Sequence, residues 1–190
     1  MGCMNIVITL LQRGAYVDAT TVRGETALHL ACRASQLDIV LILLRNRASV
    51  NAVARENQTP LHIAARIGNL EIIQALLDNG ANIHDQTSHL FTPLHISAKE
   101  NHEEVTLLLL ERGASLSSAS KSGFSPLHLS VKYGNIKITK LLIAKNAAIN
   151  AQGKNGLTPL HVAAHYDHPE IALLLLSHGA GKFCFIIFFL

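Results

Sequence analysis

One short motif returns along this chain at a fixed interval of 33 residues. It reads TALHLA from Thr26, TPLHIA from Thr59, TPLHIS from Thr92, SPLHLS from Ser125 and TPLHVA from Thr158. Self-similarity at a period of about 20–50 residues is typical of stacked supersecondary units rather than of one globular domain. We therefore predict an array of structural repeats in which each unit packs mainly against its neighbours.

Each unit is predicted to contain two short helices and a projecting finger. In the unit 56–88, Thr59 suits an N-cap and Pro60 suits the first helical position, and a second apolar helix follows from Leu70. The polar, turn-rich segment after Gly80 favours a β-hairpin or turn finger. The fold class is thus an all-α solenoid of stacked helix-turn-helix units. Its structural motif consists of Thr59, Pro60, Leu61, His62, Thr92, Pro93, Leu94, His95, Ser125, Pro126, Leu127, His128, Thr158, Pro159, Leu160 and His161.

The period also predicts where the units lie. Residues 1–22 form a partial unit with only a second helix and a finger. Complete units span 23–55, 56–88, 89–121 and 122–154, an incomplete unit spans 155–181, and the apolar segment 182–190 lies outside the array.

Turn residues should close both helices of each unit, and those that close the second helix should be in the left-handed backbone region. The first helix is predicted to end at Ser35, Gly68, Asn101, Gly134 and Asp167, all small or polar types that tolerate turns. The second helix is predicted to end at Arg47, Gly80, Gly113, Asn146 and Gly179. Arg47 should be strained there because its Cβ disfavours a positive φ.

The period and the T-P-L-H-x-A signature resemble the ankyrin repeat, over about Asn5 to Gly181. The segments VRGETALHLA, KSGFSPLHLSVKYG and GKNGLTPLHVAAHYD are similar to the middle repeats of the membrane-binding domain of ankyrins. Two positions depart from the pattern: Arg47 replaces a glycine, and Leu90 replaces the glycine two residues before the motif threonine. Both departures concern local finger and turn geometry.

The five motif histidines lie in the first turn of the first helix. The resemblance implies that they bond to backbone and hydroxyl groups of their own and neighbouring fingers while neutral. A metal site is the alternative, because His161, His165 and His168 lie at i, i+4 and i+7. No glutamate completes an H-E-x-x-H motif, and three unevenly spaced cysteines predict neither a disulfide framework nor a zinc site. We expect no cofactor.

Basic side chains recur four residues after each motif histidine. The residues that follow them are Ala34, Ile67, Glu100, Tyr133 and Tyr166, and two phenylalanines directly precede the motif. We expect the aromatic residues to be too exposed for core positions, which together with the cations favours protein recognition. The predicted groove for an extended acidic and apolar peptide is formed by Arg33, Arg66, Ile67, Lys99, Lys132, Tyr133, His165, Tyr166, Phe91 and Phe124.

Two other interpretations of these cations are a solvated helix end and a nucleic-acid site. Cations stabilise a helix C-terminus by about 0.3–1 kcal/mol each, so the pattern is also compatible with a merely solvated face. Nucleic acid is disfavoured because the formal net charge is only +3 and Glu100 interrupts the basic row. The ankyrin resemblance places the row on the concave face formed by first helices and fingers.

The resemblance implies a non-catalytic scaffold in the cytoplasm, at the membrane-associated cytoskeleton. The implied partners are cytoplasmic tails or loops of exchangers, pumps, channels and adhesion molecules, with no small-molecule substrate and no membrane insertion. A regulatory ankyrin-repeat protein that holds a soluble signalling or transcription factor is the alternative. An enzyme or metal protein using His161, His165 and His168 is a third hypothesis.

The two ends of the chain depart from a capped solenoid. No further unit follows Ile171, Leu174 and Leu175, so we expect exposed apolar flanks and a fragment of a longer array. The segment FCFIIFFL is far shorter than the roughly 20 residues that span a bilayer. We expect it to promote self-association.

Overall fold

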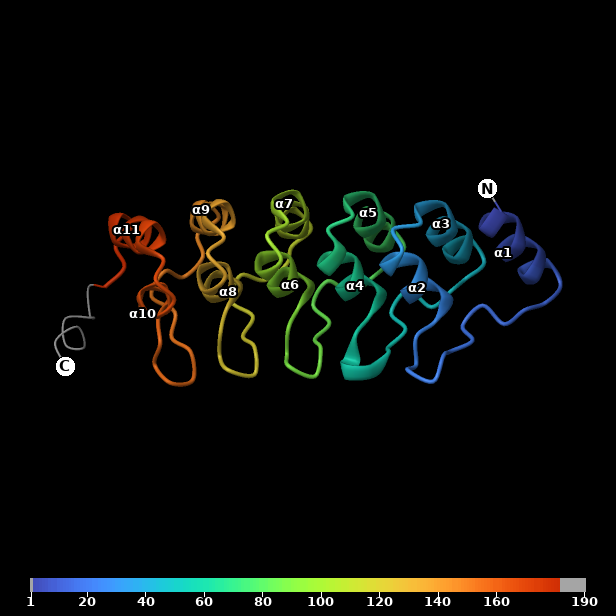
Figure 1. Cartoon of the computed structure of the whole chain (residues 1–190), viewed down its shortest axis with the longest axis horizontal. Coiled ribbons are helices and arrows are strands. Elements are labelled where there is room, and N and C mark those ends of the chain that lie inside the picture. The colour runs from blue at the N-terminus through green and yellow to red at the C-terminus, as the bar shows by residue number, and fades with distance from the viewer. Residues whose placement is uncertain (1, 182–190) are drawn as a thin grey trace. The chain divides into compact units, whose positions relative to one another are not determined.

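The computed structural model describes residues 2–181, so Cys184 and the apolar segment 182–190 lie outside the described residues. Within that range the chain forms eleven α-helices, one 3₁₀-helix, and no strand beyond an isolated bridge between Thr20 and Thr26. The predicted all-α class is confirmed, and the fingers are turns rather than paired strands (Figure 1).

Short first helices begin at the motif, and second helices follow them. The first helices are α2 (Ala27–Arg33), α4 (Pro60–Ile67), α6 (Pro93–Lys99), α8 (Pro126–Lys132) and α10 (Pro159–His165). The second helices are α1 (Gly2–Gln12), α3 (Leu37–Arg45), α5 (Leu70–Asp78), α7 (Glu103–Glu111), α9 (Ile136–Ala144) and α11 (Pro169–Ser177). The 3₁₀-helix η1 (Arg55–Asn57) lies in one finger.

The chain divides into two compact units, Met1–Pro93 and Leu94–Leu190. We call them the first unit and the second unit. Within each, first helices pack on second helices, and the fingers extend beyond the first helices (Figure 1). Leu28, Leu43, Leu61, Ile72, Ile73 and Leu76 are fully buried in the first unit, and Leu94, Leu109, Leu127, Ile138, Leu142 and Leu175 in the second. The apolar positions of the repeat therefore supply both cores.

The motif residues determine where the first helices begin. The hydroxyl of Thr59 accepts a hydrogen bond from the backbone N–H of His62 at 3.4 Å, and Ser125 does the same for His128. Pro60 occupies the first helical position, where a backbone N–H would have no partner within the helix. A hydroxyl cap followed by proline thus starts the helix at the predicted residue.

Each finger closes on a backbone hydrogen bond that recurs with the repeat. An N–H donates to the carbonyl four residues later at 2.9–3.0 Å, in the pairs Thr21–Glu25, Ala54–Gln58, Thr87–Phe91, Ser120–Phe124 and Gly153–Leu157. Neighbouring fingers are also joined: the N–H of Arg55 donates to the carbonyl of Arg23, and that of Lys154 to Ser122, both at 3.1 Å. These bonds hold the tips of successive fingers together.

The left-handed conformation predicted after the second helices is confirmed, and the residues that follow the first helices share it. Positive φ values of 53–86° occur at Ser35, Gly68, Asn101, Gly134 and Asp167, and values of 62–88° at Arg47, Gly80, Gly113, Asn146 and Gly179. Leu90 also has φ +59°, close to the +73° of Gly24 at the equivalent finger position. Arg47 and Leu90 therefore keep the backbone geometry of the glycines that they replace, at a cost in strain.

We expect Arg47→Gly and Leu90→Gly each to raise the free energy of unfolding by about 0.5–1 kcal/mol. Glycine removes the backbone strain that a residue with a Cβ has at positive φ. This gain in the folded state exceeds the loss of stability from the greater conformational entropy of glycine in the unfolded chain. A Cβ at Gly80 would meet no atom within 4 Å, so the strain at this type of position is torsional rather than steric. Urea denaturation measures the change, and the reverse substitution Gly80→Arg should lower stability by about 1 kcal/mol. Destabilisation by Arg47→Gly would contradict the strain argument.

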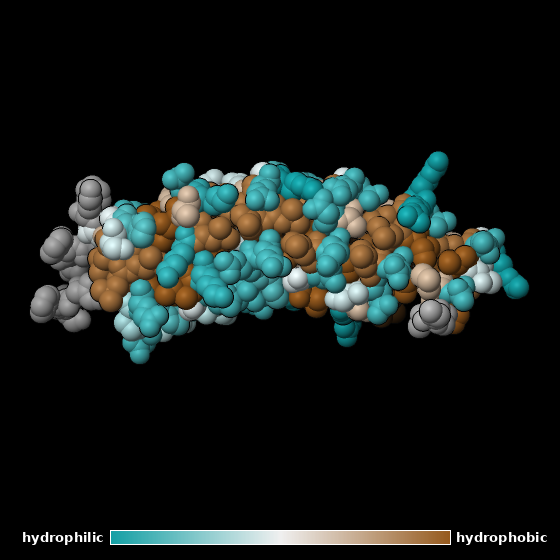
Figure 2. Space-filling view, turned by 90° about the horizontal axis from the view of Figure 1, so that it is seen from above, coloured by the Kyte–Doolittle hydropathy of each residue, from teal (hydrophilic) through white to brown (hydrophobic). Residues whose placement is uncertain are grey.

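The prediction that Ile171 and Leu175 form an exposed apolar flank is wrong. Ile171 is 3% exposed and Leu175 is fully buried, because α11 turns them toward α9 and α10. Instead, Leu173 and Leu176 of α11 are 68% and 49% exposed. Figure 2, seen from above, shows hydrophobic surface at both ends of the described chain, where α11 and α1 lie.

Candidate protein-binding site

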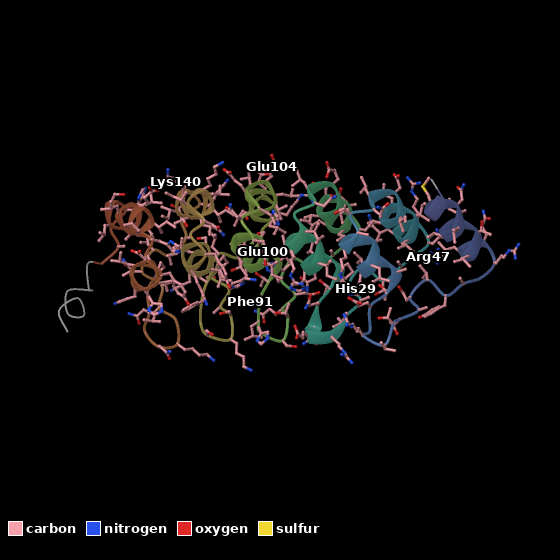
Figure 3. All side chains as sticks on the ribbon, viewed as in Figure 1. His29, Arg47, Phe91, Glu100, Glu104 and Lys140 are labelled. Carbon is pink, nitrogen blue, oxygen red and sulfur yellow. The ribbon has the colours of Figure 1, made fainter. Side chains whose placement is uncertain are left out.

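Four of the five motif histidines, His29, His62, His95 and His128, join their own helix to a finger. His29 Nδ1 accepts a hydrogen bond from the backbone N–H of Thr26 at 3.1 Å, so the ring proton is on Nε2, which donates to the carbonyl of Gln58 at 3.1 Å. Figure 3 shows His29 between α2 and the fingers. The same Nε2 bond runs from His62 to Phe91, from His95 to Phe124 and from His128 to Leu157, at 3.0–3.1 Å. These four histidines therefore make the bonds to neighbouring fingers that the resemblance implies.

Burial keeps these imidazoles neutral. Desolvation lowers the pKa of His29, His62 and His128 below the ordinary value of 6.5, and lowers the pKa of His95 to about 4. Protonation would also place a hydrogen on Nδ1, where it would face the backbone N–H that now donates to this nitrogen, and the hydrogen bond would be lost. The histidines therefore cross-link the repeats in a single tautomer.

The alternative metal site is not assembled within the described residues. His161 Nδ1 accepts from the N–H of Thr158 at 3.2 Å, and His168 Nε2 donates to the Lys132 carbonyl at 3.3 Å. The ring of His165 packs edge-on against Tyr166. Over residues 2–181, no group of three His, Cys, Asp or Glu side chains is placed to hold a metal ion.

Cys32 is a buried free thiol in the core of the first unit, and burial raises its pKa to about 12. A thiol with that pKa is not a nucleophile at neutral pH.

In the first unit, the two basic side chains of the predicted groove pair with residues that precede their own motifs. Arg33 forms an ion pair with Glu25, and this hydrogen bond lowers the pKa of the Glu25 carboxyl. Arg66 Nη1 donates to Gln58 Oε1 at 3.0 Å. Beside them Ile67 is 41% exposed. This pairing holds both guanidinium groups at the helix ends.

In the second unit, lysines and tyrosines alternate along the surface. The Nζ of Lys99 lies 5.3 Å from the ring centroid of Tyr133, and the Nζ of Lys132 lies 5.7 Å from Tyr133 and 5.3 Å from Tyr166. Cations within about 6 Å of an aromatic face are attracted to it. We call Lys99, Tyr133, Lys132 and Tyr166 the Lys–Tyr row. Tyr133 and Tyr166 remain 47% and 41% exposed, so the row presents aromatic surface and positive charge together.

The expected exposure of the two phenylalanines is wrong. Phe124 is half-buried, packs on the core of the second unit, and stacks on His128 with ring centroids 5.0 Å apart. A Cβ at Gly153 would lie 2.9 Å from this ring, so the next finger passes close beneath it. Phe91 is also half-buried, near the fingers in Figure 3. The backbone carbonyls of Phe91 and Phe124 accept hydrogen bonds from the Nε2 atoms of His62 and His95.

Two further arginines near Arg33 and Arg66 were not predicted from the sequence. Arg23 and Arg55 lie on adjacent fingers, where they line a cavity with Arg33 and Arg66. They occupy different positions of the 33-residue period, so a comparison of equivalent positions does not pair them. Only the hydrogen bond between their backbones reveals the neighbourhood.

Each helix in the described part of the chain falls short of the length and apolar character that crossing a bilayer requires.

Comparisons with known families agree with the repeat architecture. A family model described as ankyrin repeats (3 copies) matches residues 50–120 and 114–184, and one described as ankyrin repeats (many copies) matches residues 10–64. A search of curated proteins found no match. The first model alone covers well over half of the chain, and its matches contain the capped helices α4, α8 and α10 and the finger bonds of His62, His95 and His128. The chain belongs to the ankyrin-repeat family.

Proposed function

We propose that this chain is a non-catalytic scaffold that holds an extended, acidic and apolar segment of a partner protein. Ankyrin-repeat proteins are generally non-catalytic interaction modules, and repeat stacking leaves the variable side chains at the surface. The observation that carries the proposal is the Lys–Tyr row, which combines exposed aromatic rings with ammonium groups. Aromatic residues are enriched in protein interfaces and often anchor them.

The charge and shape of the row favour an acidic segment with apolar side chains. A carboxylate would bond Lys99 or Lys132, whose flexible ammonium groups can reach it while their stems stay on the rings. An apolar side chain would cover the exposed faces of Tyr133 or Tyr166. Glu100 bonds Lys99 at 3.0 Å and limits the positive charge at that position, which disfavours a polyanion such as nucleic acid.

For the class of partner, we propose the cytoplasmic tails or loops of membrane proteins, namely exchangers, pumps, channels or adhesion molecules. What supports this class is the resemblance of three segments, VRGETALHLA, KSGFSPLHLSVKYG and GKNGLTPLHVAAHYD, to the membrane-binding domain of ankyrins. On the same ground we propose a location in the cytoplasm, at the membrane-associated cytoskeleton.

A pull-down tests this function. We expect immobilised full-length chain to retain tails that contain acidic and apolar residues, and to lose most of that retention in Lys132→Glu. The matched control is Lys140→Glu, because Lys140 is exposed on α9, on the side away from the fingers (Figure 3). Retention of soluble transcription or signalling factors in place of tails would favour a regulatory role. Equal loss in both variants would contradict the site.

A further inference from the structure

A cavity of about 310 Å³ lies in the first unit, between two fingers and the ends of α2 and α4. Four arginines line it: Arg23, Arg33, Arg55 and Arg66. We call it the arginine pocket. Its volume is within the range of sites that enclose a ligand group, about 300–1,000 Å³.

The backbone brings the four side chains together from separate elements. Arg33 and Arg66 lie in the last turns of the first helices of adjacent repeats, one period apart. Arg23 and Arg55 come from the adjacent fingers, held by the 3.1 Å bond between the N–H of Arg55 and the carbonyl of Arg23. The pocket is therefore built by helix ends and finger tips that the fold fixes independently of any ligand.

The side chains that line the arginine pocket carry a net positive charge. Glu25 and Glu56 also line the pocket, so four guanidinium groups against two carboxylates leave an excess of two positive charges. Glu25 is already paired with Arg33. Within the described residues, Arg23 and Arg55 form no ion pair. Their guanidinium donors are positioned to meet an anion from outside.

We propose that the arginine pocket binds a phosphorylated side chain of a partner protein. A phosphoserine or phosphothreonine carries a charge of about −1.5 to −2 and three acceptor oxygens, which matches the excess charge and the fork-shaped donors of arginine. A single carboxylate would neutralise only half of the excess. Nucleic acid is disfavoured because it needs a continuous basic track, whereas the net charge of the chain is only +3.

This inference goes beyond the proposed function, because the arginine pocket and the Lys–Tyr row belong to different units of the chain. Phosphorylation of the partner would add an anchor at the first unit that an unmodified acidic segment does not supply. Binding at the first unit would then depend on the partner's modification state, and binding at the second unit would not.

The test is a phosphoserine peptide library with degenerate flanks, compared with its unphosphorylated twin and with a Glu-substituted twin on the full chain. Peptides selected from the library are titrated by fluorescence anisotropy. We expect the phosphorylated form to bind at least tenfold more tightly than either twin. Arg23→Gln with Arg55→Gln should abolish that preference, and inorganic phosphate should compete at far higher concentration than the peptide.

Two controls separate this proposal from the proposed function. Arg45→Gln removes the same charge from the exposed end of α3 and should leave the preference intact, while circular dichroism confirms that all variants are folded. Lys132→Glu should also leave it intact, so failure at one site is distinguishable from failure at the other. Equal affinity for the three peptide forms, or a preference that survives Arg23→Gln with Arg55→Gln, would overturn the proposal. Tighter binding of a single-stranded oligonucleotide would overturn it as well.

Discussion

Lowering the pH from 7 to 4 is expected to reduce the free energy of unfolding by about 3 kcal/mol through His95 alone. Burial lowers the pKa of His95 from 6.5 to about 4 in the folded chain. Between these values the unfolded state binds a proton that the folded state does not. Stability is therefore fully present above about pH 6.5, falls as the pH decreases, and levels off below the folded pKa. His29, His62 and His128 add to the loss because their pKa values are also lowered.

Urea denaturation at several pH values between 7 and 4 measures this dependence. His95→Gln should lower stability at pH 7, because it removes the bond to the Phe124 carbonyl, and should make the pH dependence shallower. The matched variant His84→Gln makes the same substitution at an exposed histidine of a finger and controls for the change of residue type. A slope unchanged by His95→Gln would mean that this imidazole is not held neutral by the fold.

Leu61→Asp is expected to cost more than 4 kcal/mol and to unfold at least the helices around it. Leu61 is 1% exposed in the core of the first unit. The substitution removes a packed apolar side chain and buries a carboxylate with no partner, and both effects are among the most destabilising known for single residues. The neighbouring Pro60→Ala should cost less than about 1 kcal/mol, because alanine is well tolerated at the first helical position.

Thermal denaturation followed by circular dichroism distinguishes the two variants. Loss of helicity is expected for Leu61→Asp, and a melting temperature near that of the parent chain for Pro60→Ala. Leu127→Asp is the equivalent change in the second unit, where Leu127 is also 1% exposed, and should be as severe. Similar stability of Leu61→Asp and Pro60→Ala would mean that the inner and outer faces of α4 are inverted.

The starts and ends of the helices were predictable from the sequence, because they depend on capping and turn residues that recur with the repeat. The 33-residue period locates the N-caps, and small or polar residues locate the left-handed helix ends. Arg47 and Leu90 show that the period is the stronger guide, since both adopt positive φ despite their side chains. The intrinsic preference of a residue against a positive φ is overcome when the packing of the neighbouring repeats fixes the backbone at that position.

Side-chain contacts between repeats were less predictable. The sequence placed Lys99, Lys132, Tyr133 and Tyr166 near one another, and the Lys–Tyr row brings them within cation–π range. It did not predict that Phe124 turns inward, because that depends on the close approach of Gly153 from the next finger along the chain. Contacts between residues at different positions of the period leave no periodic signal in one sequence.

The central claim is that the partner segment lies on the Lys–Tyr row, and NMR of the tyrosine rings tests it most directly. The chain has three tyrosines, of which Tyr133 and Tyr166 belong to the row, and Tyr16 is 75% exposed in the first unit. Titration with an unphosphorylated tail retained by the chain should shift the ring signals of Tyr133 and Tyr166 in a saturable manner and leave those of Tyr16 unchanged. Saturable binding that leaves Tyr133 and Tyr166 unmoved would place the partner elsewhere and contradict the account.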